Sequence, residues 1–342
     1  MLISDCVFLE VMMALTTFEM LKRPRRNRQT SSIRQLAQEH TLCAGDFVAP
    51  LFLIPGDKRR EQIEAMPGIE RHSVDFLVKE AEILHAQGIP AVDLFPSIDP
   101  FAKDHEGSEA WNPNGLVPTA IRLLKREVPS LCVIADIALD PYTSHGHDGI
   151  PNEFHEIEND LTLEALIRQS LIYAEAGADI LAPSDMMDGR VKFIREALDA
   201  QGFQNVGILS YCAKYASAFY GPFRNAIQTS LSFGDKKTYQ MDPANVREAI
   251  REAILDEEEG ADMLMVKPAL PYLDVIAKIK EKTTLPVGAY HVSGEYAMIM
   301  AAHERGWLDA QKTFYESLIG IKRAGADFIF TYAINQILDL LN

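Results

Sequence analysis

The sequence predicts an α/β fold, a (β/α)8 TIM barrel preceded by an extended N-terminal arm. Short apolar runs rich in Val, Ile and Phe recur along the chain, amphipathic stretches alternate with them, and 342 residues suffice for one large barrel with extensions. We expect the arm over residues 1–40 and the catalytic barrel over residues 41–342. An open doubly wound sheet is the structural alternative.

The apolar runs are expected to be strands because they do not alternate with polar residues, as is typical of strands buried on both faces. Eight such runs favour a closed barrel over an open sheet. No GxGxxG or GxxxxGK[ST] phosphate loop follows any of them, which also counts against the open sheet. The runs are FVAPLFLI (47–54), AVDLFPS (91–97), CVIADIAL (132–139), DILAPS (179–184), VGILSYCA (206–213), DMLMVKP (262–268), PVGAYHVS (286–293) and DFIFTY (327–332).

The amphipathic stretches between these runs are expected to be helices. Three of them end in the related junctions AEAGADIL, EEEGADML and KRAGADFI, after which a strand follows at once. Gly177, Gly260 and Gly325 suit the left-handed conformation that ends a helix. The stretches are residues 73–87, 161–176, 191–200, 246–259 and 310–324.

The sequence of the N-terminal region does not indicate a membrane span, a signal peptide or a nucleic-acid-binding segment. The apolar segment 6–18 is too short to span a bilayer and lacks the basic start of a signal peptide. Translation could also start at Met12, Met13 or Met20. One interpretation of the first 20 residues is therefore a start codon assigned too far upstream. The basic cluster at residues 22–28 has no interleaved aromatic residues, which favours a solvated arm.

The net charge and the cysteine spacing indicate which partners and which cellular compartment to expect. With 33 Lys and Arg against 49 Asp and Glu, the formal charge of −16 argues against nucleic acid or an anionic membrane as a partner. The four cysteines lie far apart and form no CxxC pair, which indicates a reduced, cytoplasmic protein.

Polar residues stand where the predicted strands end, and a barrel places its active site at the carboxyl ends of its strands. These residues are Asp136, Ser184, Asp185, Lys214, Lys267, Ser293 and Tyr332. Lys214 and Lys267 carry the most weight because each closes a buried run. Burial lowers the pKa of a lysine, and the free amine attacks a carbonyl to give a Schiff base. Contact with a phosphate or carboxylate is the alternative for a single such lysine.

Two loops add to this predicted site. Segments YGPFR (220–224) and FGDKKTYQ (233–240) combine glycines with Arg224 and Lys236, as expected of a mobile lid that holds a carboxylate. A solvated surface loop is the alternative. The loop DPYTSHGHDG (140–149) has two histidines and two aspartates, and its hard oxygen donors favour magnesium or no metal.

From about residue 20 to the C-terminus the sequence closely resembles the 5-aminolevulinate dehydratase, or porphobilinogen synthase, family. Many long strings match in order, so the resemblance is specific. They are RPRRNR (23–28), MPG (66–68), LFP (94–96), ADIALDPYTSHGHDG (135–149), APSDMMDGR (182–190), SYCAKYASAFYGPFR (210–224), TYQMDP (238–243), GADMLMVKP (260–268), YHVSGEYAM (290–298) and RAGAD followed by TY (323–332).

The resemblance implies a lyase of tetrapyrrole (heme) biosynthesis that condenses two 5-aminolevulinate molecules to porphobilinogen with loss of water. It implies that Lys267 forms a Schiff base with the substrate that supplies the propionate side of the product. Ser293 and Tyr332 would bind the carboxylate of that substrate, and Lys214 would hold the second substrate.

For the second substrate the resemblance implies a separate set of contacts. Arg224, Lys236 and Gln240 would bind its carboxylate under the closed lid. Asp136 and Ser184 would lie near its amino group, with Asp185 nearby.

The resemblance also implies a metal requirement and an assembly. Zinc-dependent members have three cysteines where this chain has Ala138, Asp140 and Asp148, so no zinc is expected. The chain resembles the magnesium-responsive branch, in which a residue matching Glu252 holds an allosteric Mg²⁺ mainly through waters; an ordinary solvated glutamate is the alternative. Whether Asp140 or Asp148 binds a metal stays open. The family forms homo-octamers through its N-terminal arms, and a hexamer is an alternative.

Two other functions compete with this one. A class I aldolase is also a Schiff-base barrel, but one lysine suffices for its chemistry. A non-catalytic barrel kept for binding or assembly would not be expected to combine both lysines with Arg224, Ser293 and Tyr332.

Overall fold

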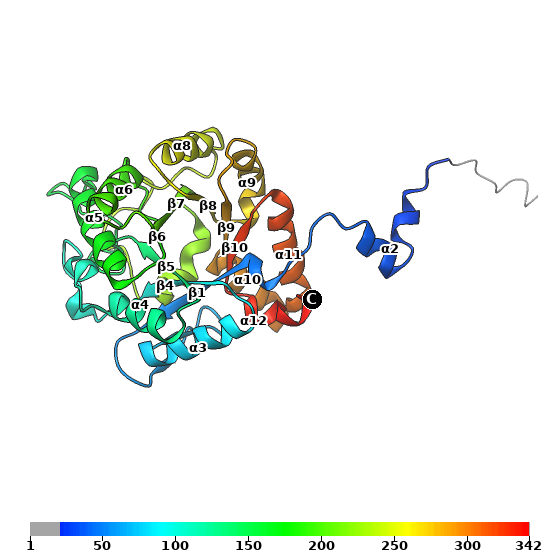
Figure 1. Cartoon of the computed structure of the whole chain (residues 1–342), viewed down its shortest axis with the longest axis horizontal. Coiled ribbons are helices and arrows are strands. Elements are labelled where there is room, and N and C mark those ends of the chain that lie inside the picture. The colour runs from blue at the N-terminus through cyan, green and yellow to red at the C-terminus, as the bar shows by residue number, and fades with distance from the viewer. Residues whose placement is uncertain (1–20, 342) are drawn as a thin grey trace, which may run out of the picture. The chain divides into compact units, whose positions relative to one another are not determined.

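The computed structural model describes residues 21–341, which include a closed barrel of eight parallel strands (Figure 1). The strands follow one another around the barrel in chain order, and the first pairs with the last to close it. The predicted barrel is therefore confirmed, and the open sheet is excluded. Its strands are β1 (Phe47–Leu53), β4 (Ala91–Pro96), β5 (Cys132–Ile137), β6 (Ile180–Pro183), β7 (Gly207–Lys214), β8 (Met263–Lys267), β9 (Val287–His291) and β10 (Phe328–Thr331).

The strands are apolar throughout because both of their faces are covered. One face points into the barrel, and the other lies under a helix. Accordingly, every residue of β4 and of β9 is buried. All eight apolar runs of the sequence analysis form these strands.

Helices cover the outside of the barrel (Figure 1). The predicted helices form as α3 (Val74–Ala86), α5 (Asn159–Ala176), α6 (Arg190–Ala200), α8 (Arg247–Glu258) and α11 (Ala310–Ala324). The others are α4 (Leu116–Glu127), α7 (Gly221–Ala226), α9 (Leu273–Lys280), α10 (Ser293–Glu304) and α12 (Ile334–Ile337). Gly177, Gly260 and Gly325 follow helix ends with φ of 103°, 103° and 116°, which confirms their predicted conformation.

A small hairpin, which the sequence analysis does not predict, extends the sheet beside β1. It consists of β2 (Arg60–Gln62) and β3 (Glu70–His72), which are too short to show an apolar pattern. Arg71 of β3 is buried, and its guanidinium donates hydrogen bonds to the carbonyl oxygens of Asn225, at 2.6 Å, and Ala226. The hairpin therefore anchors the end of α7, which belongs to the predicted lid.

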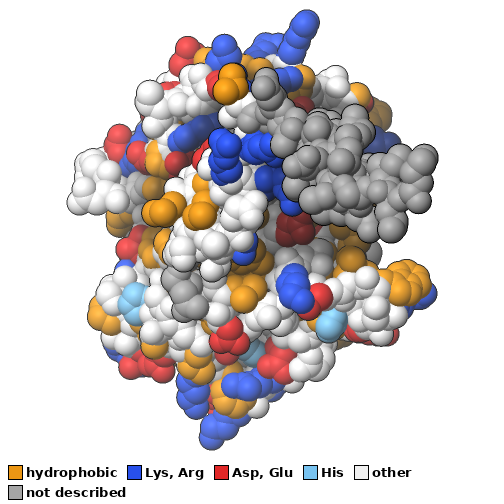
Figure 2. All heavy atoms as spheres, turned by 90° about the vertical axis from the view of Figure 1, so that its right-hand side faces the viewer, with side chains coloured by type: hydrophobic (Ala, Val, Ile, Leu, Met, Phe, Trp, Pro, Cys, Tyr) orange, Lys and Arg blue, Asp and Glu red, His pale blue; other side chains and the backbone are white. Residues whose placement is uncertain are grey.

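Contacts divide the chain after Thr41. Residues 21–41 contain the 3-10 turn η1 (Pro24–Arg28) and α2 (Ser31–Leu36), and neither element buries a residue. Predictions about the first 20 residues, including the apolar segment 6–18, lie outside the described part of the chain. No helix within residues 21–341 is long and apolar enough to cross a membrane. On the face that Figure 2 shows, the visible hydrophobic side chains of the described residues form small groups.

Candidate active site

Two lysines lie side by side at the carboxyl ends of neighbouring barrel strands. Lys214 ends β7 and Lys267 ends β8, and the two residues are partners in the parallel pairing of these strands. Both are almost fully buried, with 6% and 5% of their surface exposed. The barrel therefore brings together the two residues that the sequence analysis ranks first.

The amine of Lys267 lies among aromatic rings. Its Nζ is 4.4 Å from the ring centre of Tyr290 and 5.1 Å from those of Tyr211 and Phe223. Among the described residues it has no ion pair. Burial and the nearby charge of Lys214 together lower the pKa of Lys267 to about 8, although carboxylates oppose the shift. Part of Lys267 is therefore a free amine at neutral pH and can attack a carbonyl.

This pKa predicts how imine formation depends on pH. Since the free amine is the nucleophile, its fraction should rise from roughly a tenth at pH 7 to half near pH 8. We expect the initial rate of adduct formation, measured by rapid borohydride quenching with saturating 5-aminolevulinate, the substrate that the resemblance implies, to rise several-fold over that interval and level off near pH 9. A rate that is constant or falls between pH 7 and 8 would contradict this assignment.

Lys214 lies in a network of opposite charges. Its Nζ is 3.4 Å from Asp148 and donates a hydrogen bond to the carbonyl oxygen of Ser184. Lys236 reaches the same network from the loop before α8, with its Nζ 2.8 Å from Asp148 and 3.1 Å from Asp140. Burial alone would raise the pKa of Asp148, but the two lysines outweigh it and hold that pKa well below its usual range.

A small cavity of about 30 Å³ joins these groups. We expect the loop that carries Lys236 to move when substrate molecules enter this cavity. Burial raises the pKa of Asp136 in this cavity to about 7, against the opposing charges of Lys267 and Lys214. Of the predicted residues, the cavity is lined by Asp136, Ser184, Lys214, Arg224, Lys236, Gln240 and Lys267.

Ser293 and Tyr332 lie behind the rings that surround Lys267. Ser293 begins α10, and its Oγ accepts a hydrogen bond of 3.0 Å from the backbone N–H of Phe223. The hydroxyl of Tyr332 lies 2.9 Å from that of Tyr290. Neither residue lines the small cavity, but each contacts a residue whose ring faces the Lys267 amine.

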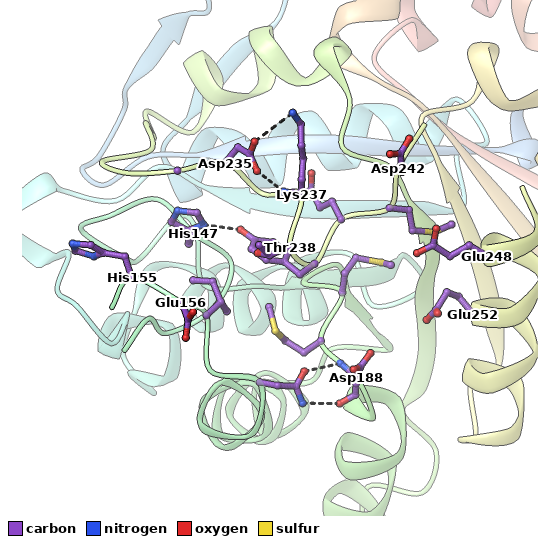
Figure 3. A pocket seen from close by; sticks show the side chains of 18 of the residues that line it. His147, His155, Glu156, Asp188, Asp235, Lys237, Thr238, Asp242, Glu248 and Glu252 are labelled. Carbon is purple, nitrogen blue, oxygen red and sulfur yellow. Dashed lines mark hydrogen bonds and ion pairs between the residues drawn. The ribbon is translucent and has the colours of Figure 1, made fainter. Parts of the chain in front are cut away.

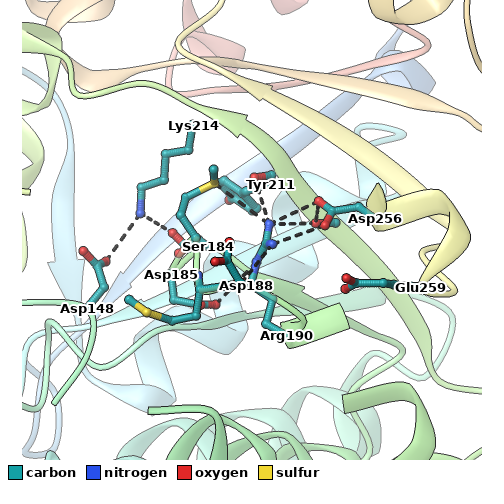
Figure 4. Close-up of polar contacts among 12 residues, drawn as sticks. Asp148, Ser184, Asp185, Asp188, Arg190, Tyr211, Lys214, Asp256 and Glu259 are labelled. Carbon is teal, nitrogen blue, oxygen red and sulfur yellow. Dashed lines mark hydrogen bonds and ion pairs between the residues drawn. The ribbon is translucent and has the colours of Figure 1, made fainter. Parts of the chain in front are cut away.

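Asp185 is placed differently from its neighbour Ser184. Its carboxylate accepts a hydrogen bond of 2.7 Å from the backbone N–H of Met187 and faces Arg190 at 3.8 Å (Figure 4). Burial raises the pKa of Asp185 to about 6, although Arg190 opposes the shift. Asp185 therefore belongs to the wall behind the cavity rather than to its lining.

Arg190 is the centre of this wall. Its guanidinium donates to both carboxylate oxygens of Asp256 at 3.2 Å, to Ser210 Oγ at 3.0 Å and to the carbonyl oxygen of Tyr211 at 3.2 Å (Figure 4). Because Asp256 lies on α8 and Ser210 and Tyr211 on β7, Arg190 ties that helix to the strand that carries Lys214.

Glu252 lies in a separate and much larger cavity of about 870 Å³ (Figure 3). It shares this cavity with Glu248 of the same helix α8 and with Asp188 and Asp242. Burial, together with the charge of Asp256, raises the pKa of Glu252. Gln240 lines both cavities, but neither lysine lines this one, so the structure brings Glu252 together with Gln240 and not with Lys214 or Lys267.

Three buried charged residues of this region are missing from the sequence analysis: Asp93, Arg190 and Asp256. Asp93 could have been found, because it is a lone carboxyl group within the apolar run 91–97. Arg190 and Asp256 lie on amphipathic helices, where a charged residue is ordinary, and only the packing of α6 and α8 buries them.

The model of the delta-aminolevulinic acid dehydratase family matches residues 21–340. The chain belongs to the delta-aminolevulinic acid dehydratase family. The family member of Bradyrhizobium diazoefficiens is 56% identical over 91% of this chain and 88% of its own length. That of Chlamydia pneumoniae is 51% identical over 96% of this chain and 98% of its own.

A solved structure of this family agrees. The delta-aminolevulinic acid dehydratase of Toxoplasma gondii, determined in complex with the reaction product porphobilinogen, covers 95% of this chain and 92% of its own. It is 49% identical, with a TM-score of 0.92. The predicted family, an alternative name of which is 5-aminolevulinate dehydratase, is therefore confirmed, and the aldolase alternative has no support.

Proposed function

We propose that this member of the delta-aminolevulinic acid dehydratase family condenses two molecules of 5-aminolevulinate to porphobilinogen, with Lys267 and Lys214 as the amines that bind the two keto groups. The observation that carries the proposal is the pairing of two buried lysines on adjacent strands at the mouth of the barrel. An imine makes the carbon beside it easier to deprotonate, which is what carbon–carbon bond formation between two ketones needs.

The two lysines have surroundings that fit different tasks. Lys267 is surrounded by rings and is partly a free amine, which suits imine formation with the first substrate. Ser293 and Tyr332 would bind the carboxylate of this substrate when the ring of Phe223 moves with the lid. Lys214 stands among carboxylates and would hold the second substrate.

The lid cations supply the contacts for the second carboxylate. In the structure, Lys236 pairs with Asp140 and Asp148. A substrate carboxylate would replace these partners for Lys236, with Arg224 and Gln240 beside it. Asp136 and Ser184 would then face the amino group of this substrate. Asp136, with a pKa near 7, can exchange a proton there at neutral pH. Asp185, which faces Arg190 at 3.8 Å, would lie nearby in the wall behind the cavity.

The positions that would be zinc ligands in zinc-dependent members do not fit a zinc site here. Ala138 has no donor atom, and Asp140 and Asp148 are engaged by lysine ammonium groups. We propose that the enzyme works without zinc.

We further propose that Mg²⁺ acts from the large cavity that Glu252 lines. Glu248, Asp188 and Asp242 also line this cavity, and their oxygens suit a hard cation. No group of three His, Cys, Asp or Glu side chains within residues 21–341 is arranged to hold a metal directly. This favours a magnesium ion held mainly through water molecules, which would supply positive charge near α8.

An assay after removal of metals tests both the reaction and its metal. Chelated enzyme is supplied with 5-aminolevulinate, and porphobilinogen is measured with added Mg²⁺ or Zn²⁺. We expect product without zinc and a several-fold higher rate with magnesium. Activity that needs zinc would overturn the metal assignment alone, and a lack of product with either metal would overturn the reaction and favour a non-catalytic barrel.

Substitution of Glu252 tests the magnesium site. Because Glu252 is half-buried and faces the large cavity, Glu252→Ala should abolish the rate increase that magnesium causes while the magnesium-free rate persists. Glu258→Ala, on the same helix but exposed and outside the cavity, is the matched control and should keep the full increase. An unchanged magnesium response in Glu252→Ala would place the ion elsewhere.

We also propose an oligomeric state and a cellular location for the enzyme. Neither η1 nor α2 buries a residue, and both contain exposed arginines, which supports a homo-octamer in which each arm wraps a neighbouring copy. Sedimentation of the full chain would distinguish the octamer from a hexamer. We expect the enzyme in the cytoplasm because the cysteines of the described residues, Cys43, Cys132 and Cys212, form no disulfide.

A further inference from the structure

Asp93 is a carboxyl group enclosed within the barrel, and the site described above gives it no role. It is the third residue of β4 and is fully buried, with 0% of its surface exposed. Neither of its oxygens has a hydrogen-bond partner among residues 21–341. A carboxyl group buried in this way costs stability.

The strand register places Asp93 directly below the active site. Side chains two residues apart on a strand share a face, and the ring of Phe95, two residues further along β4, has its centre 5.9 Å from Lys267 Nζ. On the neighbouring strand β5, Asp93 is paired with Ile134, two residues before Asp136. Asp93 therefore points into the barrel, one layer of side chains below Phe95 and Asp136.

The groups that face Asp93 come from most of the barrel. Its neighbour β1 has no titratable side chain. Asp136 Oδ1 and the Tyr211 hydroxyl, like Asp93, lack a hydrogen-bond partner in the described part of the chain. The titratable groups that interact electrostatically with Asp93 are Asp136 and Cys132 of β5, Tyr211 of β7, Lys267 of β8, Tyr290 of β9 and Tyr332 after β10.

A count of charges shows what Asp93 can do. Lys214 and Lys236 are paired with Asp148 and Asp140, so these four charges compensate one another. Lys267 is left without an ion pair among the described residues, with two carboxyl groups, Asp136 and Asp93, near it. While Lys267 is a free amine, no positive charge balances either carboxyl group, so Asp93 holds a proton. A positive charge on the Lys267 nitrogen can balance one carboxylate, and Asp93 supplies it because Asp136 would face the amino group of the second substrate.

The deeper group is the one that holds the proton. Burial raises the pKa of Asp93 well above its usual range, and the charge of Asp136 raises it further, whereas Lys267 opposes the shift. Asp93 is therefore a neutral acid as long as Lys267 is a free amine. A positive charge on the Lys267 nitrogen favours release of that proton.

We propose that Asp93 is the internal counter-charge of Lys267, a positioning residue that keeps its proton while the amine is free and releases it when the nitrogen becomes positively charged in the substrate imine. This inference rests on the proposed function. As the imine forms, a C–N bond is made, the carbonyl C–O bond breaks and water leaves. One amine hydrogen stays on the nitrogen, which becomes a cation, and the other leaves on the carbonyl oxygen. The second hydrogen of the departing water is balanced by the proton that Asp93 gives up, so the net charge of the barrel interior is unchanged.

Borohydride trapping as a function of pH tests this inference. Borohydride reduces the protonated imine, so the amount of 5-aminolevulinate adduct on Lys267, located by peptide mass mapping, reports the cation. Enzyme equilibrated with substrate is reduced between pH 6.5 and 9.5. For Asp93→Asn we expect the alkaline fall in adduct to begin about one pH unit lower, with about tenfold less adduct at the alkaline end. Near neutral pH the adduct should approach that of the wild type.

Two further variants separate charge from structure. In Asp93→Ala the side chain at this position has no polar atom, and the alkaline fall in adduct should shift as in Asp93→Asn. The test therefore does not depend on whether the asparagine variant folds correctly. Ser170→Ala is the matched control, because Ser170 Oγ on α5 is also buried without a hydrogen-bond partner among residues 21–341. It should keep the wild-type profile.

The outcomes are distinct. A wild-type pH profile in the Asp93 variants, or a uniform loss of adduct at every pH, would overturn the counter-charge. The uniform loss would indicate a purely structural role. Absence of any adduct in the wild-type enzyme would instead overturn the proposed function, and the inference with it.

Discussion

Replacement of Lys267 by Met is expected to reduce porphobilinogen formation by more than about 10³-fold, because the side chain keeps its length but loses the attacking amine. The adduct on residue 267 should disappear from the borohydride experiment. The fold should persist, since an amine whose pKa is lowered by burial disfavours the folded state, and an apolar side chain removes that cost. A thermal melt and a sedimentation profile like those of the wild type would verify this.

The control for this experiment is a lysine of the same barrel that faces solvent. Lys278 on α9 is exposed, and Lys278→Met should retain full activity. Peptide mapping also shows whether Lys214 is still modified in Lys267→Met. If Lys267→Met kept more than a tenth of the wild-type rate, another group would have to be the nucleophile, and the assigned role would be wrong.

Replacement of Arg190 by Met is expected to destabilise the protein by about 3–5 kcal/mol, which is the usual cost of leaving buried charges without their partner. Arg190 is 2% exposed and is the counter-ion of Asp256 and Asp185, both of which stay buried when it is removed. The measurement is the free energy of unfolding in urea at one fixed protein concentration, since assembly contributes to stability.

A neighbouring ion pair supplies the comparison. Lys192 also lies on α6, but its side chain is 55% exposed, with its Nζ 4.0 Å from Glu196, so Lys192→Met should cost no more than about 0.5 kcal/mol. A second change, Asp256→Leu, should recover part of the stability lost in Arg190→Met by removing one unpaired charge. If Arg190→Met lowered the free energy of unfolding by less than about 1 kcal/mol, water would have to reach the site and solvate the charges left unpaired.

Much of the fold could be predicted because its signals are local. Each barrel strand is a short apolar run, and the predicted helices have an apolar stripe with a period near 3.6 residues. Gly177 and Gly325 mark helix ends because glycine, which has no Cβ, tolerates the required left-handed conformation without strain. The hairpin of β2 and β3 escaped prediction because three residues are too few to show a period.

The sequence predicted which residues belong to the candidate site better than it predicted how these residues are arranged. Lys214 and Lys267 stand out because a cation at the end of a buried apolar run is unusual. Nothing local indicates that Asp185 turns toward Arg190, or that Lys236 takes Asp140 and Asp148 as partners across 96 and 88 residues of chain.

The sequence by itself determined the barrel, its excess of acidic residues, its family and the two lysines at the ends of adjacent strands. Only the tertiary structure decided which charges meet and which are buried. It separated Glu252 from the lysines, enclosed Asp93 below Lys267 and left Lys267 without an ion pair among the described residues. The physical reason is that strands and helices follow from patterns within about 15 residues, whereas desolvation and charge pairing depend on loops that meet at the mouth of the barrel from distant parts of the chain.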